Sequence, residues 1–148
     1  MSDAVDKMKI IIATSPFDIE RCFPVMRQLR PHLSMEGFAG QVKRQMDFAG
    51  YRLVLCEADG AVMAAAGYRI SEFLAWGKTL YVDDLITDES ARGRGFGGIL
   101  MDWLVGKAGE SGCAEVHLDS GVHRFDAHRL YLNKRMNITA HHFAVRLA

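Results

Sequence analysis

The chain has 148 residues, the size of one ordinary domain, so we expect a single domain over residues 1–148. Its 18 Lys and Arg balance its 18 Asp and Glu, and this lack of basic excess argues against a nucleic-acid partner. Hydrophobic residues make up 49% and charged residues 24%, a globular composition that excludes a disordered chain.

Local chemistry signals the first elements. A polar start over residues 1–8, which we expect to be flexible, precedes a β-branched run over 9–13 that predicts a strand. Ser15 is a favourable N-cap, and Pro16 suits the first helical position. Apolar residues then recur every three or four positions, so the pattern predicts one helix that ends at Pro31.

The rest of the chain divides by the same periodicities, with Asp59-Gly60 as the clearest hairpin turn. The predicted segments are, in order, a connection over 32–37, a helix over 38–49, strands over 51–58 and 62–70, a mobile excursion over 71–77, a strand over 78–87, a glycine-rich turn over 88–98, a long helix closed by Gly109, a strand over 114–119, a helix over 126–136 and a strand over 139–147. Hairpins in the first half and helix-joined strands in the second predict a mixed α+β (α/β) fold, with helices on both faces of a central sheet.

Three widely spaced cysteines, Cys22, Cys56 and Cys113, form neither a metal-binding pattern nor a CxxC pair. We therefore expect free thiols in a reducing, cytoplasmic compartment. No apolar stretch approaches the roughly 20 residues of a membrane span, so we expect no membrane association. The six histidines show no metal-ligand spacing, and we expect no bound metal.

The turn over 88–98 carries the strongest functional signal in the chain. A predicted strand ends there and a long helix begins, and a helix start offers an anion unpaired N–H donors and about half a positive charge. Glycines let the oxygens of an anion approach the backbone closely, and two arginines add charge for phosphate groups. The residues concerned are Arg92, Gly93, Arg94, Gly95, Gly97 and Gly98. The pattern predicts a phosphate or pyrophosphate site.

Two familiar phosphate-binding patterns fit this turn poorly. A P-loop needs Lys followed by Ser or Thr after its last glycine, and here Ile99 follows Gly98. The dinucleotide pattern GxGxxG matches Gly93, Gly95 and Gly98, but only 50 residues follow, too few for the repeated βαβ units of that fold.

A third pattern, Arg/Gln-x-x-Gly-x-Gly/Ala, is fitted in full by Arg92-Gly93-Arg94-Gly95-Phe96-Gly97, and here the sequence resembles the GCN5-related N-acetyltransferase (GNAT) superfamily. The acid-bearing strand before the loop, the long helix, the strand over 116–119 and the late helix with Tyr131 follow in the order of that family. Residues 124–132 are most similar to the branch that includes aminoalkylphosphonate N-acetyltransferases. Arg135-Met136 stand where the family usually has Gly-Phe or Gly-Tyr, so we expect the end of the late helix to be built differently.

The resemblance implies a GNAT-type fold, with a twisted mixed sheet whose two middle parallel strands splay apart around acetyl-CoA as cosubstrate. Backbone groups of the strand that ends at Thr87 would bind the pantetheine arm, and an N–H near Leu85 would stabilise the oxyanion. The following loop would hold the pyrophosphate, and Asn133 would also contact the cofactor. The implied cofactor residues are Leu85, Ile86, Thr87, Arg92, Gly93, Arg94, Gly95, Phe96, Gly97, Gly98 and Asn133.

The implied reaction is acetyl transfer to a primary amine by direct attack in a ternary complex. A protonated amine, with a pKa near about 10, must first lose a proton. Asp83 and Asp84 are the acids nearest to the cofactor strand, and strand alternation predicts that they point to opposite faces. We favour Asp83 as the base, directly or through a water, and keep Asp84 open. The resemblance implies that Tyr131 is the acid that protonates the departing CoA thiolate.

The acceptor is expected to contact His32, Met35, Glu36, Phe73 and Trp76. Acids near the cleft suggest a cationic small molecule such as an amino acid, a polyamine or an aminophosphonate, and a protein amine is the alternative. Two other classes stay open: a non-catalytic acyl-CoA sensor or interaction subunit, which would bind CoA without turnover, and a dinucleotide-binding oxidoreductase, which NAD(P) would stabilise. The resemblance also implies a homodimer.

Overall fold

The computed structural model describes residues 7–148; most of the start that we expect to be flexible, residues 1–6, lies outside that range. The described strands form one sheet in the order β1-β2-β3-β4-β5, antiparallel throughout except for the parallel pair β4 and β5. The elements are β1 (Met8–Ile12), α2 (Pro16–Arg21), α3 (Phe23–Leu29), α4 (Met35–Ala49), β2 (Arg52–Ala58), β3 (Ala61–Phe73), β4 (Gly77–Thr87), the 3₁₀ turn η1 (Glu89–Ala91), α5 (Phe96–Glu110), β5 (Glu115–Leu118) and α6 (Phe125–Asn133).

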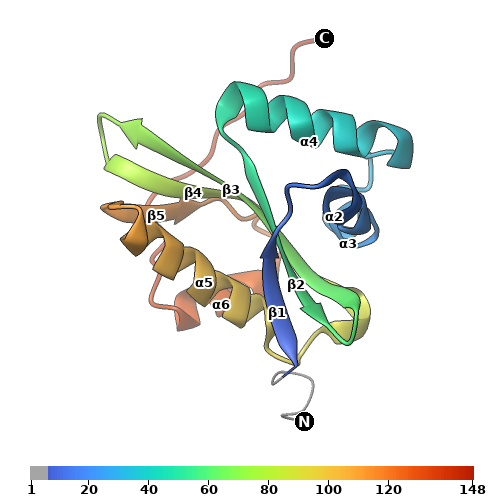
Figure 1. Cartoon of the computed structure of the whole chain (residues 1–148). Helices are drawn as coiled ribbons and strands as arrows, with labels where there is room; N and C mark the ends of the chain where they lie inside the picture. Colours follow the sequence, from blue (N-terminus) through green and yellow to red (C-terminus); the bar gives the residue numbers. More distant parts are fainter. Residues whose placement is uncertain (1–6) are drawn as a thin grey trace. The chain divides into compact units, whose positions relative to one another are not determined.

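The chain divides into two compact units, one that ends at Leu118 and one that runs from Asp119 to Ala148. In the first unit, α2, α3 and α4 cover one face of the sheet and α5 covers the other (Figure 1). Because both faces are covered, the three alanines at the centre of β3, Ala64 to Ala66, are all fully buried. The predicted central mixed sheet with helices on both faces is confirmed, while a single domain stays a prediction.

The predicted first helix is in fact two helices. Ser15 caps α2 as expected, because its hydroxyl accepts a hydrogen bond from the N–H of Asp18 at 3.1 Å. The chain breaks at Cys22, and α3 follows. Pro24 explains the break, since it has no N–H to continue the hydrogen bonds of α2 but suits the first turn of a new helix.

The next helix, α4, begins earlier than its apolar periodicity predicts. The hydroxyl of Ser34 accepts a hydrogen bond from the N–H of Gly37 at 3.1 Å, which makes Ser34 the N-cap. Met35 and Glu36 therefore lie in the first turn of α4 instead of in a connection. Phe38, where the periodicity places the start, is the first buried residue of the helix.

The segment over 71–77, predicted to leave the sheet, is instead the closed end of a regular hairpin. β3 and β4 stay paired as far as Phe73 and Gly77. Aromatic contacts explain this order, because the ring of Phe73 lies 4.9 Å from that of Trp76, and Trp76 stacks on His117 of β5 at a centroid distance of 3.7 Å.

The strand predicted over 139–147 does not form. Its alternating apolar residues Phe143, Val145 and Leu147 are 83–90% exposed. No strand within residues 7–148 pairs with this segment. Without a partner a strand gains neither ladder hydrogen bonds nor a buried face, so the alternating pattern alone does not produce one.

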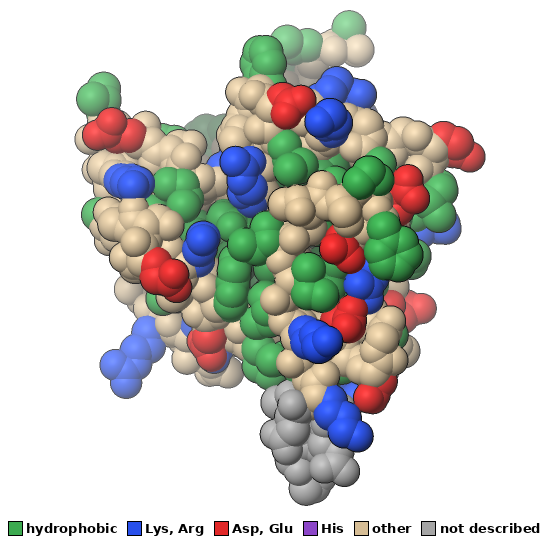
Figure 2. Space-filling view, viewed as in Figure 1, with side chains coloured by type: hydrophobic (Ala, Val, Ile, Leu, Met, Phe, Trp, Pro, Cys, Tyr) green, Lys and Arg blue, Asp and Glu red, His purple; other side chains and the backbone are tan. Residues whose placement is uncertain are grey.

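Acidic and basic side chains are interspersed over the face seen in Figure 2, in keeping with the zero net charge. None of the helices described is both long enough and apolar enough to cross a bilayer.

Candidate active site

A β-bulge in β4 shapes the centre of the site. Gly67 of β3 faces Asp84, whereas the next residue, Tyr68, faces Val82, so Asp83 is the extra residue of β4. The bulge interrupts the alternation of side chains, and Asp83 and Asp84 both line one cavity. The prediction that they point to opposite faces is therefore wrong, because alternation holds only for a strand without a bulge.

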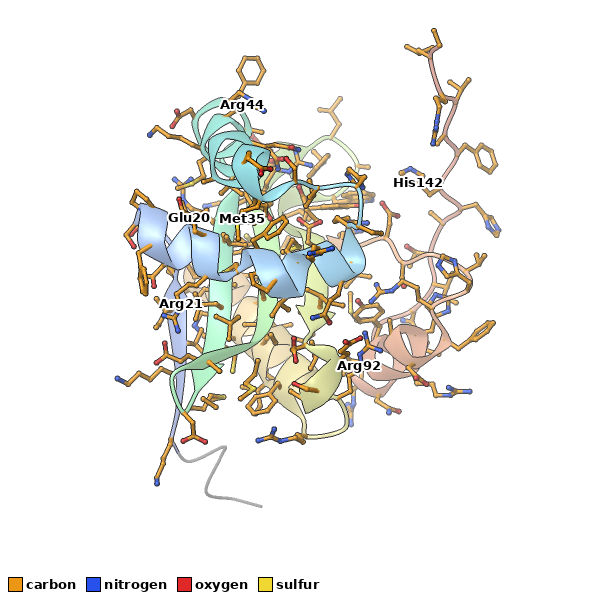
Figure 3. All side chains as sticks on the ribbon, turned by 90° about the vertical axis from the view of Figure 1, so that its right-hand side faces the viewer. Glu20, Arg21, Met35, Arg44, Arg92 and His142 are labelled. Carbon is orange, nitrogen blue, oxygen red and sulfur yellow. The ribbon has the colours of Figure 1, made fainter. Side chains whose placement is uncertain are left out.

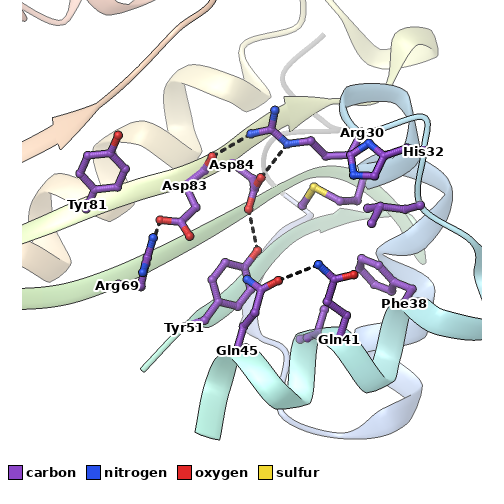
Figure 4. Close-up of a pocket in the computed structure, with 13 residues that line it drawn as sticks. Arg30, His32, Phe38, Gln41, Gln45, Tyr51, Arg69, Tyr81, Asp83 and Asp84 are labelled. Carbon is purple, nitrogen blue, oxygen red and sulfur yellow. Dashed lines mark hydrogen bonds and ion pairs between the residues drawn. The ribbon is translucent and has the colours of Figure 1, made fainter. Parts of the chain in front are cut away.

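The cavity has a volume of about 450 Å³ and is shown in Figure 4. Its walls come from α3, α4, the connections that follow each of these two helices, and the strands β3 and β4. The lining residues are Met26, Arg30, His32, Leu33, Phe38, Gln41, Val42, Gln45, Tyr51, Arg69, Tyr81, Asp83 and Asp84. Four of these thirteen residues are apolar and nine are polar or charged, so the cavity suits a polar small molecule held by converging charged groups.

Asp84 is held on both carboxylate oxygens. Its Oδ1 accepts a hydrogen bond from Nε of Arg30 at 2.9 Å, and its Oδ2 accepts one from the hydroxyl of Tyr51 at 2.9 Å. Burial, followed by the charge of Asp84, raises the pKa of the Tyr51 hydroxyl well above its usual value, so Tyr51 remains a donor. With both oxygens engaged, Asp84 is better placed to position its neighbours than to accept a proton.

Asp83 is held on one oxygen only. Its Oδ1 accepts a hydrogen bond from Nε of Arg69 at 3.1 Å, while its Oδ2 accepts none from the residues that the structure describes. Burial raises the pKa of this carboxyl above its ordinary value, against the opposing hydrogen bond from Arg69. A carboxylate with one open oxygen and a raised pKa has the properties of a general base.

Gly67 leaves the space that the Tyr51 side chain occupies. A Cβ at this position would lie 1.8 Å from the Tyr51 hydroxyl oxygen and 2.2 Å from the ring carbon Cζ. Tyr51 is buried and bonded to Asp84, so it cannot move aside without losing that hydrogen bond. We expect Gly67→Ala to lower the free energy of unfolding by about 1–3 kcal/mol, the usual cost of over-packing.

Urea unfolding measures this loss, with Gly106→Ala as the matched control. No atom lies within 4 Å of a Cβ built at Gly106 of α5. That substitution is expected to leave stability unchanged or to raise it by up to about 1 kcal/mol, because alanine favours a helix. A Gly67→Ala chain as stable as the wild type would show that Tyr51 does not pack as described.

The loop between β4 and α5 presents an open helix start. Gly93 and Gly95 have φ angles of 78° and 90°, in the left-handed region that favours glycine. Gly95 is the N-cap of α5, and this 15-residue helix has neither a side-chain cap nor an acid in its first turn. Its first N–H groups therefore lack a capping side chain, which is the geometry that an anion site needs.

Side chains of the loop divide into two kinds. Arg92 (Figure 3) and Arg94 are exposed, whereas Phe96 is 1% exposed and belongs to the core. Phe96 can therefore offer a ligand only its backbone, as can Gly97 and Gly98. The guanidinium of Arg94 lies 5.1 Å from the centroid of the Phe96 ring, a cation–π contact.

Beyond the bulge, β4 has an unpaired edge. β5 pairs with β4 only from Thr79 to Val82, so no strand of the described chain continues along that edge over Leu85, Ile86 and Thr87. The side chains of Leu85 and Ile86 are buried, which leaves backbone groups as what this stretch offers a ligand. Pairing stops because β5 itself ends at Leu118, so the predicted splaying of two parallel strands stays a prediction.

In the second unit, α6 carries Tyr131 and ends at the exposed Asn133. Burial raises the pKa of the Tyr131 hydroxyl, against the charge and hydrogen bond of Arg124, so Tyr131 keeps its proton at neutral pH. Arg135 has a φ of 66°, so the chain leaves α6 through the left-handed conformation that a glycine favours. Whether relatives end this helix in the same way is not tested by that angle, so a differently built helix end stays a prediction.

Only one of the five predicted acceptor contacts reaches the cavity. His32 lines it together with Asp83 and Asp84. The other four do not line it: Met35 and Glu36 in the first turn of α4, and Phe73 and Trp76 at the tip of the β3–β4 hairpin.

Three residues that hold the aspartates carry no signal in the sequence: Arg30, Tyr51 and Arg69. Each stands outside any motif, and each meets Asp83 or Asp84 only through the fold, 14 to 54 positions away along the chain. The register of β3 against β4 and the bulge would both have to be known in advance to place Arg69 beside Asp83.

Histidine and cysteine side chains do not converge. Within residues 7–148, no three His, Cys, Asp or Glu residues gather in a way that could hold a metal ion. The three cysteines are free, and burial raises the pKa of Cys22 to about 12 and that of Cys56 to about 11. Both of these thiols are therefore unreactive at neutral pH.

A mixed sheet with an unpaired strand edge ahead of an open helix start is the architecture of an acyl-CoA N-acyltransferase. The model of the acetyltransferase (GNAT) family matches residues 18–136, and the chain belongs to this family. It is an acetyl-CoA-dependent acetyltransferase.

Individual relatives agree with this assignment. An uncharacterized N-acetyltransferase of Bacillus subtilis (strain 168), YhdJ, is 30% identical over 121 residues, which are 82% of this chain and 85% of that protein. The aminoglycoside N-acetyltransferase AAC(6′)-Iy, solved in complex with CoA, has a TM-score of 0.81 at 15% identity, over 95% of this chain and 94% of that one. Glucosamine-6-phosphate N-acetyltransferase from Arabidopsis thaliana has a TM-score of 0.77 at 18% identity, over 95% of this chain and 99% of that one. At these identities, the two structures show a shared fold.

Proposed function

We propose that this chain transfers the acetyl group of acetyl-CoA to the primary amine of a small molecule, by direct attack in a ternary complex. The observation that carries the proposal is the carboxylate of Asp83. It has an open oxygen in a cavity and stands two residues before the unpaired stretch of β4. The residue that can deprotonate the amine is therefore close in sequence to the backbone groups that can bind the thioester.

In the transfer, the amine nitrogen forms a bond to the thioester carbonyl carbon, and the carbon–sulfur bond breaks with its electron pair going to sulfur. Asp83 takes the first of the two protons that the ammonium nitrogen loses, directly or through one water, and the second passes to solvent once the carbon–nitrogen bond has formed. Tyr131 holds a proton at neutral pH and gives it to the thiolate. The products are an amide and free CoA, and both residues return to their starting states by exchange with solvent.

The cosubstrate is assigned to the backbone of Leu85, Ile86 and Thr87 for the pantetheine arm and to the loop Arg92–Gly98 for the pyrophosphate, with Asn133 as a further contact. The open start of α5 and the exposed Arg92 and Arg94 fit a diphosphate in charge and in hydrogen-bonding character. The structurally similar aminoglycoside enzyme was solved with CoA bound, which supports the same cosubstrate here.

A small-molecule acceptor is supported by the names of the two structural neighbours, an aminoglycoside and a glucosamine-6-phosphate N-acetyltransferase. The likeness of residues 124–132 to the aminoalkylphosphonate N-acetyltransferase branch points the same way. A protein amine is the alternative acceptor.

The proposal is tested by incubating the chain with acetyl-CoA and a panel of primary amines while free thiol is measured. Amine-dependent thiol release, with the acetylated amine found by mass spectrometry, is the expected result. Acetylation of peptide amines alone would favour a protein acceptor, and CoA binding without acetylation of any small amine would contradict the proposal.

We also propose a homodimer, supported by the C-terminal tail. Phe143, Val145 and Leu147 alternate along the segment and are exposed, a pattern that a strand would bury by pairing with a second copy. Removal of residues 138–148 is expected to turn a dimer into a monomer in light scattering. Phe17→Ser, which changes another exposed apolar residue, is the control that keeps the dimer. A monomeric wild-type chain would contradict this.

We place the protein in the cytoplasm, without nucleic-acid or membrane partners. Three free cysteines suit a reducing compartment, and the balanced charge does not suit a polyanion. Cell fractionation with an antibody to the native chain tests the location, and recovery in the membrane pellet would overturn it.

A further inference from the structure

Each carboxylate of the cavity is paired with an arginine. Nε of Arg69 lies 3.1 Å from Oδ1 of Asp83, and Nε of Arg30 lies 2.9 Å from Oδ1 of Asp84. Guanidinium groups stay charged at any working pH, so the charged side chains that line the cavity sum to zero with His32 neutral. Such a cavity does not favour a purely cationic acceptor, although the two acids taken alone suggest one.

Both guanidinium groups retain donors that no described residue uses. Arg69 donates only through Nε, so both of its Nη atoms remain for a ligand. Arg30 donates through Nε to Asp84 and through Nη2 to the backbone oxygen of Asp83 at 3.0 Å, which leaves Nη1. The side chains of Arg30 and Arg69 are 42% and 40% exposed, whereas those of the two aspartates are 15–16% exposed.

Figure 4 shows these two ion pairs. Asp83 and Asp84 are adjacent on β4, and Arg69 is bonded to Asp83 and Arg30 to Asp84. An ammonium group at the open oxygen of Asp83 would be within a few bond lengths of the Nη atoms of Arg69. Two positions of opposite charge preference therefore lie close together in one small-molecule cavity.

We propose that the acetyl acceptor is a zwitterion, a short primary amine whose other end is an oxyanion bound by the Nη donors of Arg69. This rests on the acetyl transfer proposed above and narrows its acceptor. A planar guanidinium matches the paired oxygens of a carboxylate or phosphonate, which a neutral or cationic end cannot use. The ammonium group and the oxyanion then each meet an opposite charge in the cavity, so neither is desolvated without a partner.

The test compares amines of similar length that differ at the far end: β-alanine, 2-aminoethylphosphonate, propylamine and 1,3-diaminopropane. We expect kcat/KM for thiol release to be higher by about tenfold or more with an oxyanion than with propylamine or the diamine, since hydrogen bonds between charged groups contribute at this scale. The first two compounds distinguish a carboxylate from a phosphonate as the preferred oxyanion.

Arg69→Met, which keeps the length of the stem and removes the donors, identifies the group responsible. We expect it to lower kcat/KM for the preferred oxyanion by about 10- to 100-fold. The decrease in kcat/KM with propylamine is expected to be far smaller. Because propylamine has no oxyanion, any decrease seen with it measures the indirect effect of the substitution on Asp83. Arg44→Met on α4 (Figure 3), which lies outside the cavity, is the matched control and is expected to behave as wild type with both amines.

If propylamine or the diamine is acetylated as fast as the amines that carry an oxyanion, the proposal of a zwitterionic acceptor is wrong, while the proposal of acetyl transfer is unaffected. An equal loss with both kinds of amine in Arg69→Met would also overturn the zwitterionic acceptor. Acetylation of none of these four amines by a chain that acetylates another primary amine would overturn the inference and leave the proposed function standing.

Discussion

Asp83→Asn is expected to keep its fold and to lose about 10²- to 10⁴-fold in kcat/KM with every amine that the wild type acetylates. The asparagine amide has the shape of the carboxylate, and its oxygen can still accept the hydrogen bond from Arg69, but it cannot take a proton. Burial disfavours the ionised carboxylate in the folded chain, as the raised pKa of Asp83 indicates, so loss of this charge is not expected to lower the melting temperature. Steady-state thiol release and a thermal melt measure the two quantities.

Asp84→Asn is the control at the neighbouring position. Both oxygens of Asp84 accept hydrogen bonds, from Arg30 and from the buried Tyr51, so its neutralisation removes interactions of the folded state. We expect this variant to lose stability more than Asp83→Asn and activity less. The opposite order, with activity depending on Asp84 alone, would make Asp84 the base.

The pH dependence of activity distinguishes a base from a merely structural carboxylate. The base must be ionised, so wild-type kcat/KM falls as the pH falls through the pKa of Asp83. Burial raises that pKa, so the fall is expected to centre above the ordinary value of 3.8. Dividing the wild-type kcat/KM by that of Asp83→Asn at each pH cancels the titration of the amine. The ratio is expected to decline toward low pH, and a constant ratio would count against Asp83.

Tyr131→Phe is expected to lower kcat by about 10²-fold and to leave the KM for acetyl-CoA unchanged. Phenylalanine keeps the buried ring and removes only the hydroxyl, whose raised pKa keeps it protonated and able to donate at neutral pH. The deficit is expected to shrink above about pH 8.5, the usual pKa of a thiol, because the thiolate product then needs no proton. Rapid-quench kinetics, in which chemistry is observed directly, is the suitable measurement.

Tyr68→Phe is the matched control for that experiment. Tyr68 is a buried tyrosine of β3 that packs edge-on against Trp103, with ring centroids 5.9 Å apart, and it does not line the cavity. We expect its kcat to equal that of the wild type. An unchanged rate of chemistry in Tyr131→Phe would remove the general acid from the mechanism.

Features set by local chemistry could be predicted from the sequence. Asp59-Gly60 forms the expected tight turn, with φ angles of 52° and 78° that suit these two residues. Ser15 caps its helix because the hydroxyl needs only the N–H three residues on. The glycines between Arg92 and Gly98 open the helix start for the same kind of reason, since glycine permits positive φ wherever it stands.

Features set by pairing across the fold could not be predicted. The bulge that turns Asp83 into the same cavity as Asp84 depends on the register of β3 against β4, which the residues of β4 alone do not reveal. Arg30 and Arg69 reach the aspartates from other elements and change the expected charge of the cavity from acidic to balanced. The tail over 139–147 shows the reverse case, because its strand-like alternation finds no partner strand among the described residues of its own chain.

Calorimetric titration of CoA tests most directly whether the glycine-opened start of α5 holds the coenzyme. Gly95→Val blocks the loop conformation, and Gly77→Val is its matched control, since both glycines have positive φ and open space around a Cβ but only Gly95 belongs to the loop. We predict that each wild-type chain binds one CoA. The Kd is expected to be at least about tenfold weaker in Gly95→Val, because a strained residue at this position moves the backbone donors away from the ligand. Gly77→Val is expected to have the Kd of the wild type. No heat with the wild type, or equal binding by Gly95→Val, would contradict the assignment.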